Sequence, residues 1–149
     1  MIEPSLLRKL SLFDGLGDEQ IAILLPMLEE ESFGGSTDIV VEGTRSDKLR
    51  VIIEGRVIVQ KAGVVLMELG EGDVFGEMEI LDVGPSDTTV RTLAATKVIT
   101  LSIDAFGDIY EKDIEIYAFL FMNLARDISR KQKRVSDKAA NRSPPTEWS

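Results

Sequence analysis

The 149-residue sequence contains no cysteine and no histidine. Without cysteine there is no disulfide framework, no thiolate metal site and no thiol redox chemistry. Without histidine the commonest general base and metal ligand are missing, which argues strongly against an enzyme. No apolar run approaches the length of a membrane span, and the N-terminus lacks a signal-peptide pattern. We therefore expect a cytoplasmic protein that has no membrane partner.

Positive charge is also scarce, because 17 Lys and Arg residues face 26 Asp and Glu residues and leave a formal net charge of −9. Such an acidic chain is expected to be soluble and to lack general affinity for nucleic acid. With 44% hydrophobic residues, its length suits one domain with its own core.

The first third of the chain has a helical pattern. Apolar residues recur at helical spacing from Ile21 to Leu28, and Asp18 is placed to cap that helix. Pro26 lies inside the pattern and should kink or restart the helix. We interpret the acidic run 29–31 as a solvated helix end or edge.

After Gly35 the apolar residues alternate with polar ones, which is typical of strands. No helical crossover separates these segments, so an antiparallel sandwich or barrel is expected. The predicted strands cover residues 38–42, 49–53, 56–60, 64–69, 89–93 and 97–102.

The segment 72–81 lies at the centre of this pattern. Gly72 and Gly76 allow backbone angles and close approaches that a Cβ would obstruct, and 77–81 has the composition of a short helix. A glycine turn that opens a helix directs free N–H groups at one point, which suits an anion.

Phe75-Gly76-Glu77-Met78 resembles the phosphate-binding cassette of the cyclic-nucleotide-binding domain family, and the resemblance extends over about residues 12–135. It implies a mainly β fold, an antiparallel jelly-roll-like β-roll (double-stranded β-helix) with N-terminal helices and a long C-terminal helix. In that family the cassette glycine and helix start hold the cyclic phosphate. The glutamate binds the ribose 2′-hydroxyl, and an arginine after a proline pairs with the phosphate.

The sequence departs from this pattern at the arginine, because Ser86 follows Pro85 and Asp87 adds a negative charge beside it. Glu79 also replaces the usual alanine. Losing one partner of a desolvated charge pair costs about 3–5 kcal/mol, roughly a hundredfold to a few thousandfold in affinity. We therefore expect cAMP and cGMP binding to be weak or lost, and no cofactor is certain.

The resemblance identifies a set of candidate ligand-binding residues: Phe75, Gly76, Glu77, Met78, Ser86, Asp87, Thr88 and Thr89. Arg45 and Lys48 are candidate substitute cations, whereas Arg91 is expected to be part of the framework. Glu77 has two interpretations, a ribose ligand or a brace of the cassette. The acidic residues 77, 79, 82 and 87 are better explained as acidic surface than as a calcium site, so no metal is predicted.

A second helix is predicted over about 112–135, closing a domain of residues 1–135, and the polar tail 136–149 is expected to be disordered. Its apolar seam has heptad spacing and includes Ile114, Ala118, Phe121, Ala125 and Ile128. The helix either docks fully on its own domain or also dimerises, and we expect a homodimer. The basic run Lys131, Lys133, Arg134, Lys138 and Arg142 is interpreted as a solvated helix end, with an anionic partner as the alternative.

Two functions follow from these observations. The first is a stand-alone sensor domain that binds a nucleotide or related small anion and passes the signal to a separate protein partner through its last helix. The second is a degenerate dimeric protein–protein interaction module with no small-molecule ligand. In transcription factors of the resembled family a helix-turn-helix domain follows the long helix, and the chain ends soon after it, so we expect no DNA binding.

Overall fold

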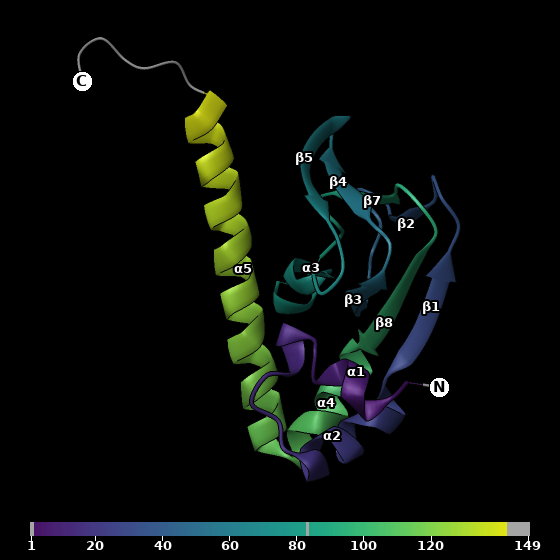
Figure 1. Ribbon diagram of the computed structural model, residues 1–149, viewed down its shortest axis with the longest axis vertical. Coiled ribbons are helices and arrows are strands. Elements are labelled where there is room, and N and C mark those ends of the chain that lie inside the picture. The colour runs from purple at the N-terminus through teal and green to yellow at the C-terminus, as the bar shows by residue number, and fades with distance from the viewer. Residues whose placement is uncertain (1, 83, 143–149) are drawn as a thin grey trace, which may run out of the picture.

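A computed structural model describes residues 2–82 and 84–142 of the chain (Figure 1). It consists of short N-terminal helices, eight strands with one short helix among them, and two C-terminal helices. The N-terminal helical elements are α1 (Pro4–Leu7), η1 (Ser11–Phe13), α2 (Asp18–Leu24) and η2 (Leu25–Met27). The strands are β1 (Glu29–Phe33), β2 (Asp38–Val40), β3 (Lys48–Glu54), β4 (Val57–Lys61), β5 (Val64–Leu69), β6 (Val74–Phe75), β7 (Thr89–Thr92) and β8 (Thr96–Ser102). The remaining helices are α3 (Glu77–Leu81), α4 (Ile103–Lys112) and α5 (Ile114–Arg142).

The strands form two antiparallel sheets of four, in the orders β1-β8-β3-β6 and β2-β7-β4-β5. Both sheets contribute to a common apolar core, which buries Ile52 and Val98 from one sheet and Val57, Leu69 and Val90 from the other. This arrangement confirms the β-roll fold with flanking helices. At the β3–β4 turn Gly55 has φ +98°, and a Cβ there would lie 2.5 Å from the Ala95 carbonyl oxygen.

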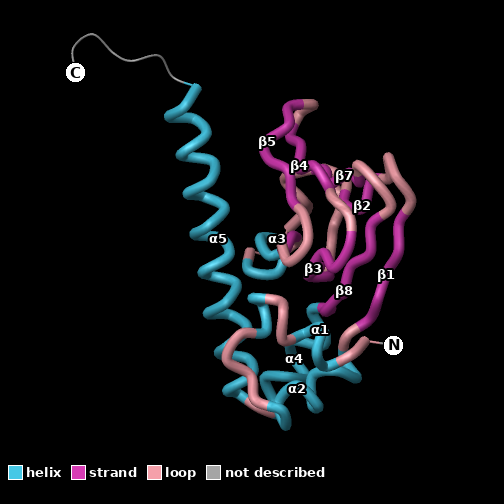
Figure 2. The backbone as a smooth tube through the Cα atoms, in the orientation of Figure 1, coloured by secondary structure: helices cyan, strands magenta, loops and turns pink. Residues whose placement is uncertain are grey.

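Helices α1, α2 and α4 and the lower part of α5 pack together at one end of the roll (Figure 2). Leu7, Leu24, Ile109, Ile116 and Leu120, from the four helices α1, α2, α4 and α5, are fully buried in this second core. It continues into the sheet that contains β3 and β8. The roll and its helices therefore share one continuous framework.

The helix at residues 18–24 ends before Pro26, as expected, and a 3₁₀ turn carries the chain onward. Asp18 is the first helical residue and not the cap, because the N-cap is Gly17, whose N–H donates to Gln20 Oε1 at 3.0 Å. The interpretation of residues 29–31 as a helix end was wrong. They begin β1, the edge strand of its sheet, where Glu31 pairs with Arg50 at 2.9 Å.

Helix α5 is 29 residues long and starts after Asp113, whose Oδ1 accepts hydrogen bonds from the N–H groups of Glu115 and Ile116. It is longer than predicted, because residues 136–142 are helical and not part of a disordered tail. The rest of the predicted tail, 143–149, lies outside the described residues. The upper part of α5 projects alongside the roll (Figures 1 and 2).

Two different stripes run along α5. Ile116, Leu120 and Leu124 face the domain and are fully buried. The predicted seam lies on another side, where Ile114 is 59% exposed, Ala118 and Ala125 are exposed, and Phe121 and Ile128 are half-buried. Docking on its own domain therefore covers the seam only in part, at Phe121 and Ile128. In the described residues no helix is long and apolar enough to cross a bilayer.

Candidate functional site

The cassette is built where β6 passes into α3. Gly76 joins them with φ +90°, in the left-handed region, and a Cβ there would lie 2.6 Å from the Lys48 carbonyl oxygen. Both facts require glycine at this position. The turn aims Glu77, the first residue of α3, inward, so that this carboxylate is buried.

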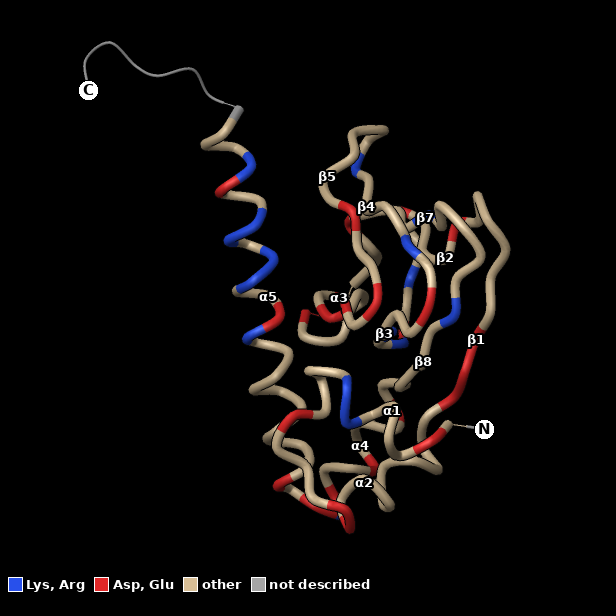
Figure 3. Tube along the Cα trace, in the orientation of Figure 1, with Lys and Arg blue, Asp and Glu red and all other residues tan. Residues whose placement is uncertain are grey.

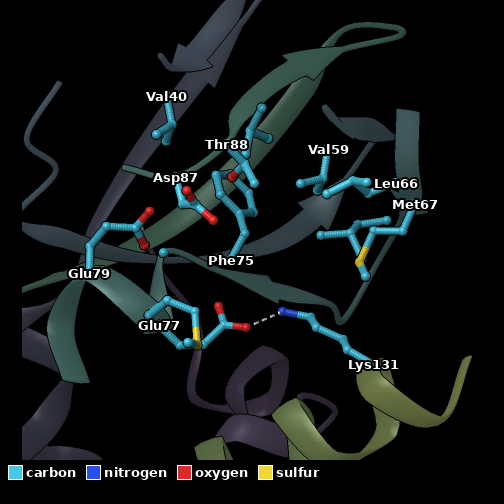
Figure 4. Close-up of a pocket in the computed structure, with 14 residues that line it drawn as sticks. Val40, Val59, Leu66, Met67, Phe75, Glu77, Glu79, Asp87, Thr88 and Lys131 are labelled. Carbon is cyan, nitrogen blue, oxygen red and sulfur yellow. Dashed lines mark hydrogen bonds and ion pairs between the residues drawn. The ribbon is translucent and has the colours of Figure 1, made fainter. Parts of the chain in front are cut away.

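A cavity of about 230 Å³ opens above this turn (Figure 4). Side chains from the two sheets and from α3 and α5 line it, and most of them are apolar. The apolar members are Val40, Val59, Leu66, Met67, Leu69, Phe75, Met78 and Val90, and the charged members are Glu77, Glu79, Asp87 and Lys131.

Most of the predicted cassette residues line this cavity: Phe75, Gly76, Glu77, Met78, Asp87 and Thr88. Ser86 and Thr89 do not. The Ser86 hydroxyl donates to the Thr88 carbonyl at 2.7 Å and accepts from the Thr88 N–H at 3.3 Å, so it is used within its own turn. The Thr89 hydroxyl accepts from the Glu42 N–H at 3.0 Å.

None of the cations considered from the sequence lines the cavity. Arg45 forms a β-bridge with Pro85, Lys48 lies 3.5 Å from Glu31, and Arg91 pairs with Asp38 at 2.8 Å. Among the described residues, the cation that lines the cavity is Lys131 of α5. The sequence analysis interpreted Lys131 as part of a solvated helix end.

Lys131 is 8% exposed and is held by three groups at the floor of the cavity. Its ammonium lies 2.6 Å from Glu77 Oε1 and 2.9 Å from Asp127 Oδ2, and it also donates to the Val74 carbonyl. The side chains of Glu77 and Asp127 are only 7% and 6% exposed. Asp127 Oδ2 has the ammonium at contact distance but accepts no aligned hydrogen bond within the described residues.

The Glu77–Asp127–Lys131 cluster is therefore two carboxylates and one ammonium, removed from water. Burial raises the pKa of Glu77 above its ordinary value, and Asp127 adds to the rise, while Lys131 offsets part of it. In this arrangement Glu77 braces α3 against α5 and is not free to accept a hydrogen bond from a ligand unless Lys131 moves.

The rest of the basic run lies on the upper half of α5, where Lys and Arg gather (Figure 3). Lys133 and Lys138 are exposed, as expected for a solvated helix end, whereas Arg134 reaches Asp73 at 3.4 Å. The interpretation of the whole run as solvated was thus wrong for Lys131, and nothing is described of the Arg142 side chain. No group of three or more acidic side chains among the described residues could hold a metal ion.

The sequence spacing contained a signal that Lys131 faces the domain. Ile116, Leu120, Leu124 and Asp127 precede Lys131 at steps of four, four, three and four, so Lys131 continues the stripe that faces the domain. This stripe was less visible than the seam because its last two members are charged.

Comparison with known proteins agrees with this geometry. The protein-family model of the cyclic nucleotide-binding domain matches residues 30–113. The chain belongs to the cyclic nucleotide-binding domain family. It is 27% identical over 137 residues to the CRP-like cAMP-activated global transcriptional regulator of Mycobacterium tuberculosis, covering 89% of this chain and 61% of that protein. It is 30% identical over 111 residues to the cAMP-dependent protein kinase regulatory subunit of Eremothecium gossypii, covering 74% and 24%.

Among solved structures, the chain is similar to a cyclic nucleotide-binding domain from Methylobacillus flagellatus KT, with a TM-score of 0.83 and 19% identity over 96% of this chain and 83% of that one. At this identity the likeness shows the fold alone. The chain spans about three fifths of the first curated relative it matches and a quarter of the second. Both of these relatives are named as regulators.

Proposed function

We propose that the chain is a regulatory sensor domain that keeps the pocket of its family but binds cAMP and cGMP weakly or not at all. The proposal rests on one observation, that none of the described residues provides a free cation in the cavity. Ser86 uses its hydroxyl within its own turn, and Lys131 is already held by Glu77, Asp127 and the Val74 carbonyl.

A cyclic phosphate that enters this cavity would form no bidentate hydrogen bonds with an arginine guanidinium. It could reach Lys131 only in competition with two carboxylates that are part of the protein and cannot diffuse away. The acidic lining residues Glu79 and Asp87 add repulsion. The function proposed is therefore ligand sensing or association, and not catalysis, and the named regulatory relatives support that class. The cytoplasmic location remains a prediction.

Titration calorimetry with cAMP and cGMP tests the first part. We expect millimolar or undetectable binding by the wild type, and micromolar saturation would overturn the proposal. Ser86→Arg restores the arginine of the family pattern and should strengthen cAMP binding about a hundredfold or more if the turn accommodates it.

Because Ser86 is buried, a second variant is needed. Asp87 lines the cavity but its side chain is 78% exposed, so Asp87→Arg brings a cation to the site without disturbing the core. Asp137→Arg makes the same change of charge at an exposed position of α5 and should leave cAMP affinity unchanged.

We also propose that two copies pair through the seam of α5 (Ile114, Ala118, Phe121, Ala125 and Ile128), because apolar side chains at heptad spacing remain exposed or half-exposed there. Ala125→Glu introduces a charge at an exposed seam position and should convert a dimer to a monomer in sedimentation velocity. Ser129→Glu carries the same charge on the same helix beside the seam and should remain dimeric. A monomeric wild type would contradict the proposal.

The same seam supports the second candidate, a dimeric interaction module without a ligand. A thermal-shift screen with cyclic mononucleotides and cyclic dinucleotides separates the two functions, because a ligand that binds the native state raises the melting temperature by mass action. A stabilising compound other than cAMP or cGMP favours the sensor, and a dimer that no compound stabilises favours the module.

A further inference from the structure

The cavity has an unusual combination of apolar walls and negative charge. Glu77, Glu79 and Asp87 contribute three negative charges and Lys131 one positive charge, so its ionised lining carries a net charge of −2. The ammonium is not available to a ligand without rupture of its contacts with Glu77 and Asp127. This charge distribution repels an anion of any shape.

The two carboxylates on the upper side of the cavity are only weakly compensated (Figure 4). Asp87 has Lys61 at 2.8 Å, but both side chains are more than half exposed, so water screens the pair. Glu79 is half-buried and has no hydrogen bond or ion pair with the described residues in the structure. Neither is neutralised by a buried partner.

The walls supply the favourable part of binding. Val40, Val59, Leu66, Met67, Phe75 and Val90 are among the side chains that line a preformed space of about 230 Å³. Removing apolar ligand surface from water contributes roughly 25 cal/mol per Å². Preformed, mainly apolar cavities of this kind are typical of small-molecule sites.

We propose that this cavity is a binding site for a small, mainly apolar molecule that carries no negative charge. This inference deepens the function proposed above, since it names the ligand class of the same pocket. The walls retain the apolar part of the ligand, and the acidic residues at the rim select by charge and exclude carboxylates and phosphates of similar shape.

Methyl NMR of the full chain with ¹³C-labelled methionine tests this inference, because Met67 and Met78 line the cavity whereas Met27 and Met122 lie outside it. The probes are benzyl alcohol, benzylamine and benzoate, which share a ring and differ in charge. We expect the alcohol and the amine to shift the Met67 and Met78 signals in a saturable way. Benzoate should bind at least about tenfold more weakly, which corresponds to about 1.4 kcal/mol.

A double variant tests whether the acidic residues exclude anionic ligands. Glu79→Gln with Asp87→Asn removes two negative charges and should bring the benzoate affinity to within about threefold of that of benzyl alcohol. Glu111→Gln, at an exposed position of α4 remote from the cavity, should leave the tenfold difference unchanged.

Two results would overturn the inference. One is benzoate binding as tightly as benzyl alcohol to the wild type, and the other is the absence of a methyl shift with all three probes. Titration with cAMP, followed in the same spectra, distinguishes failure of the proposed function from failure of the charge selection. Tight cAMP binding overturns the proposed function, whereas weak cAMP binding together with equal binding of benzoate and benzyl alcohol overturns the charge selection alone.

Discussion

Lys131→Met should lower the free energy of unfolding by several kcal/mol, and the loss should depend on pH. Methionine keeps most of the volume of the lysine stem but removes the ammonium, which lies 2.6 Å from Glu77 Oε1 and 2.9 Å from Asp127 Oδ2. Both carboxylates, only 7% and 6% exposed, then lack a counter-charge. Removing one partner of a buried ion pair costs about 3–5 kcal/mol.

The pH dependence arises because Glu77, a buried carboxyl that has lost its counter-charge, favours its protonated form. Burial already raises the pKa of Glu77 in the wild type, and loss of Lys131 removes the group that opposes the rise. A carboxyl whose folded-state pKa lies above its unfolded value contributes full stability below the unfolded pKa and loses it as the pH rises through the folded pKa. The cost of Lys131→Met should therefore be small near about pH 4 and grow toward neutral pH, by at most about 1.4 kcal/mol per pH unit for the Glu77 carboxyl.

Urea unfolding followed by circular dichroism, from about pH 4 to about pH 8 at fixed protein concentration, measures this cost. Lys133→Met makes the same substitution at an exposed position two residues away and should change stability by less than about 0.5 kcal/mol. Glu77→Gln should cost only about 1 kcal/mol, because Lys131 and Asp127 remain as a neutral pair. A Lys131→Met protein as stable as the wild type at every pH would refute the reasoning.

Two further changes test the framework of the site. Gly76→Ala should cost about 2 kcal/mol or more in urea unfolding, since a Cβ would lie 2.6 Å from the Lys48 carbonyl oxygen, whereas Gly72→Ala, with φ +86° and nothing within 4 Å, should cost about 1 kcal/mol. Equal losses of stability in the two variants would show that the close approach at Gly76 does not destabilise the alanine variant. Asn123→Ala removes the Nδ2 donor that binds the carbonyls of Leu12 and Asp14 at 2.8 and 2.9 Å, and should cost about 1–3 kcal/mol. Unchanged stability would mean that water replaces both bonds.

The β-roll could be predicted because its signals are local. The strand 64–69 was predicted with its observed limits, and the hairpin before it turns at Ala62 and Gly63, both with positive φ. Alternation and glycine turns are properties of a few adjacent residues. The family resemblance added the sheet architecture, which alternation alone does not determine.

The two errors of secondary structure arose from charge and polarity. The run 29–31 reads equally well as a solvated helix end or an edge strand, and the choice depends on Arg50 and Lys48, which pair with Glu31 from β3, across the intervening strand β8. Residues 136–142 are polar but contain two alanines and no helix breaker, so α5 continues through them. Polarity predicts exposure and does not by itself predict disorder.

The cavity floor was harder to predict, because the partner of Lys131 lies 54 positions earlier in the chain. The period of the buried stripe could have shown that Lys131 faces the domain, but no local pattern indicates that it meets Glu77. The predicted departures at Ser86 and Asp87 concern single positions in a motif and were visible without any tertiary information.

Helix α5 carries the cavity cation and the exposed seam on adjacent faces. Ile128 lies three residues before Lys131, a rotation of about 60° around the helix, and the sequence from Ile114 to Arg142 contains no glycine or proline at which the helix could bend. A displacement of Lys131 therefore moves Ile128 with it. The lower half is held by Asn123, which donates to the carbonyls of Leu12 and Asp14, and the upper half is held to the roll by Lys131 at Glu77 and by Arg134 at Asp73. Under the proposed sensor function, a ligand that separates Lys131 from Glu77 would act on the dimer seam through this rigid connection, and the sedimentation of Lys131→Met should then differ from that of Lys133→Met.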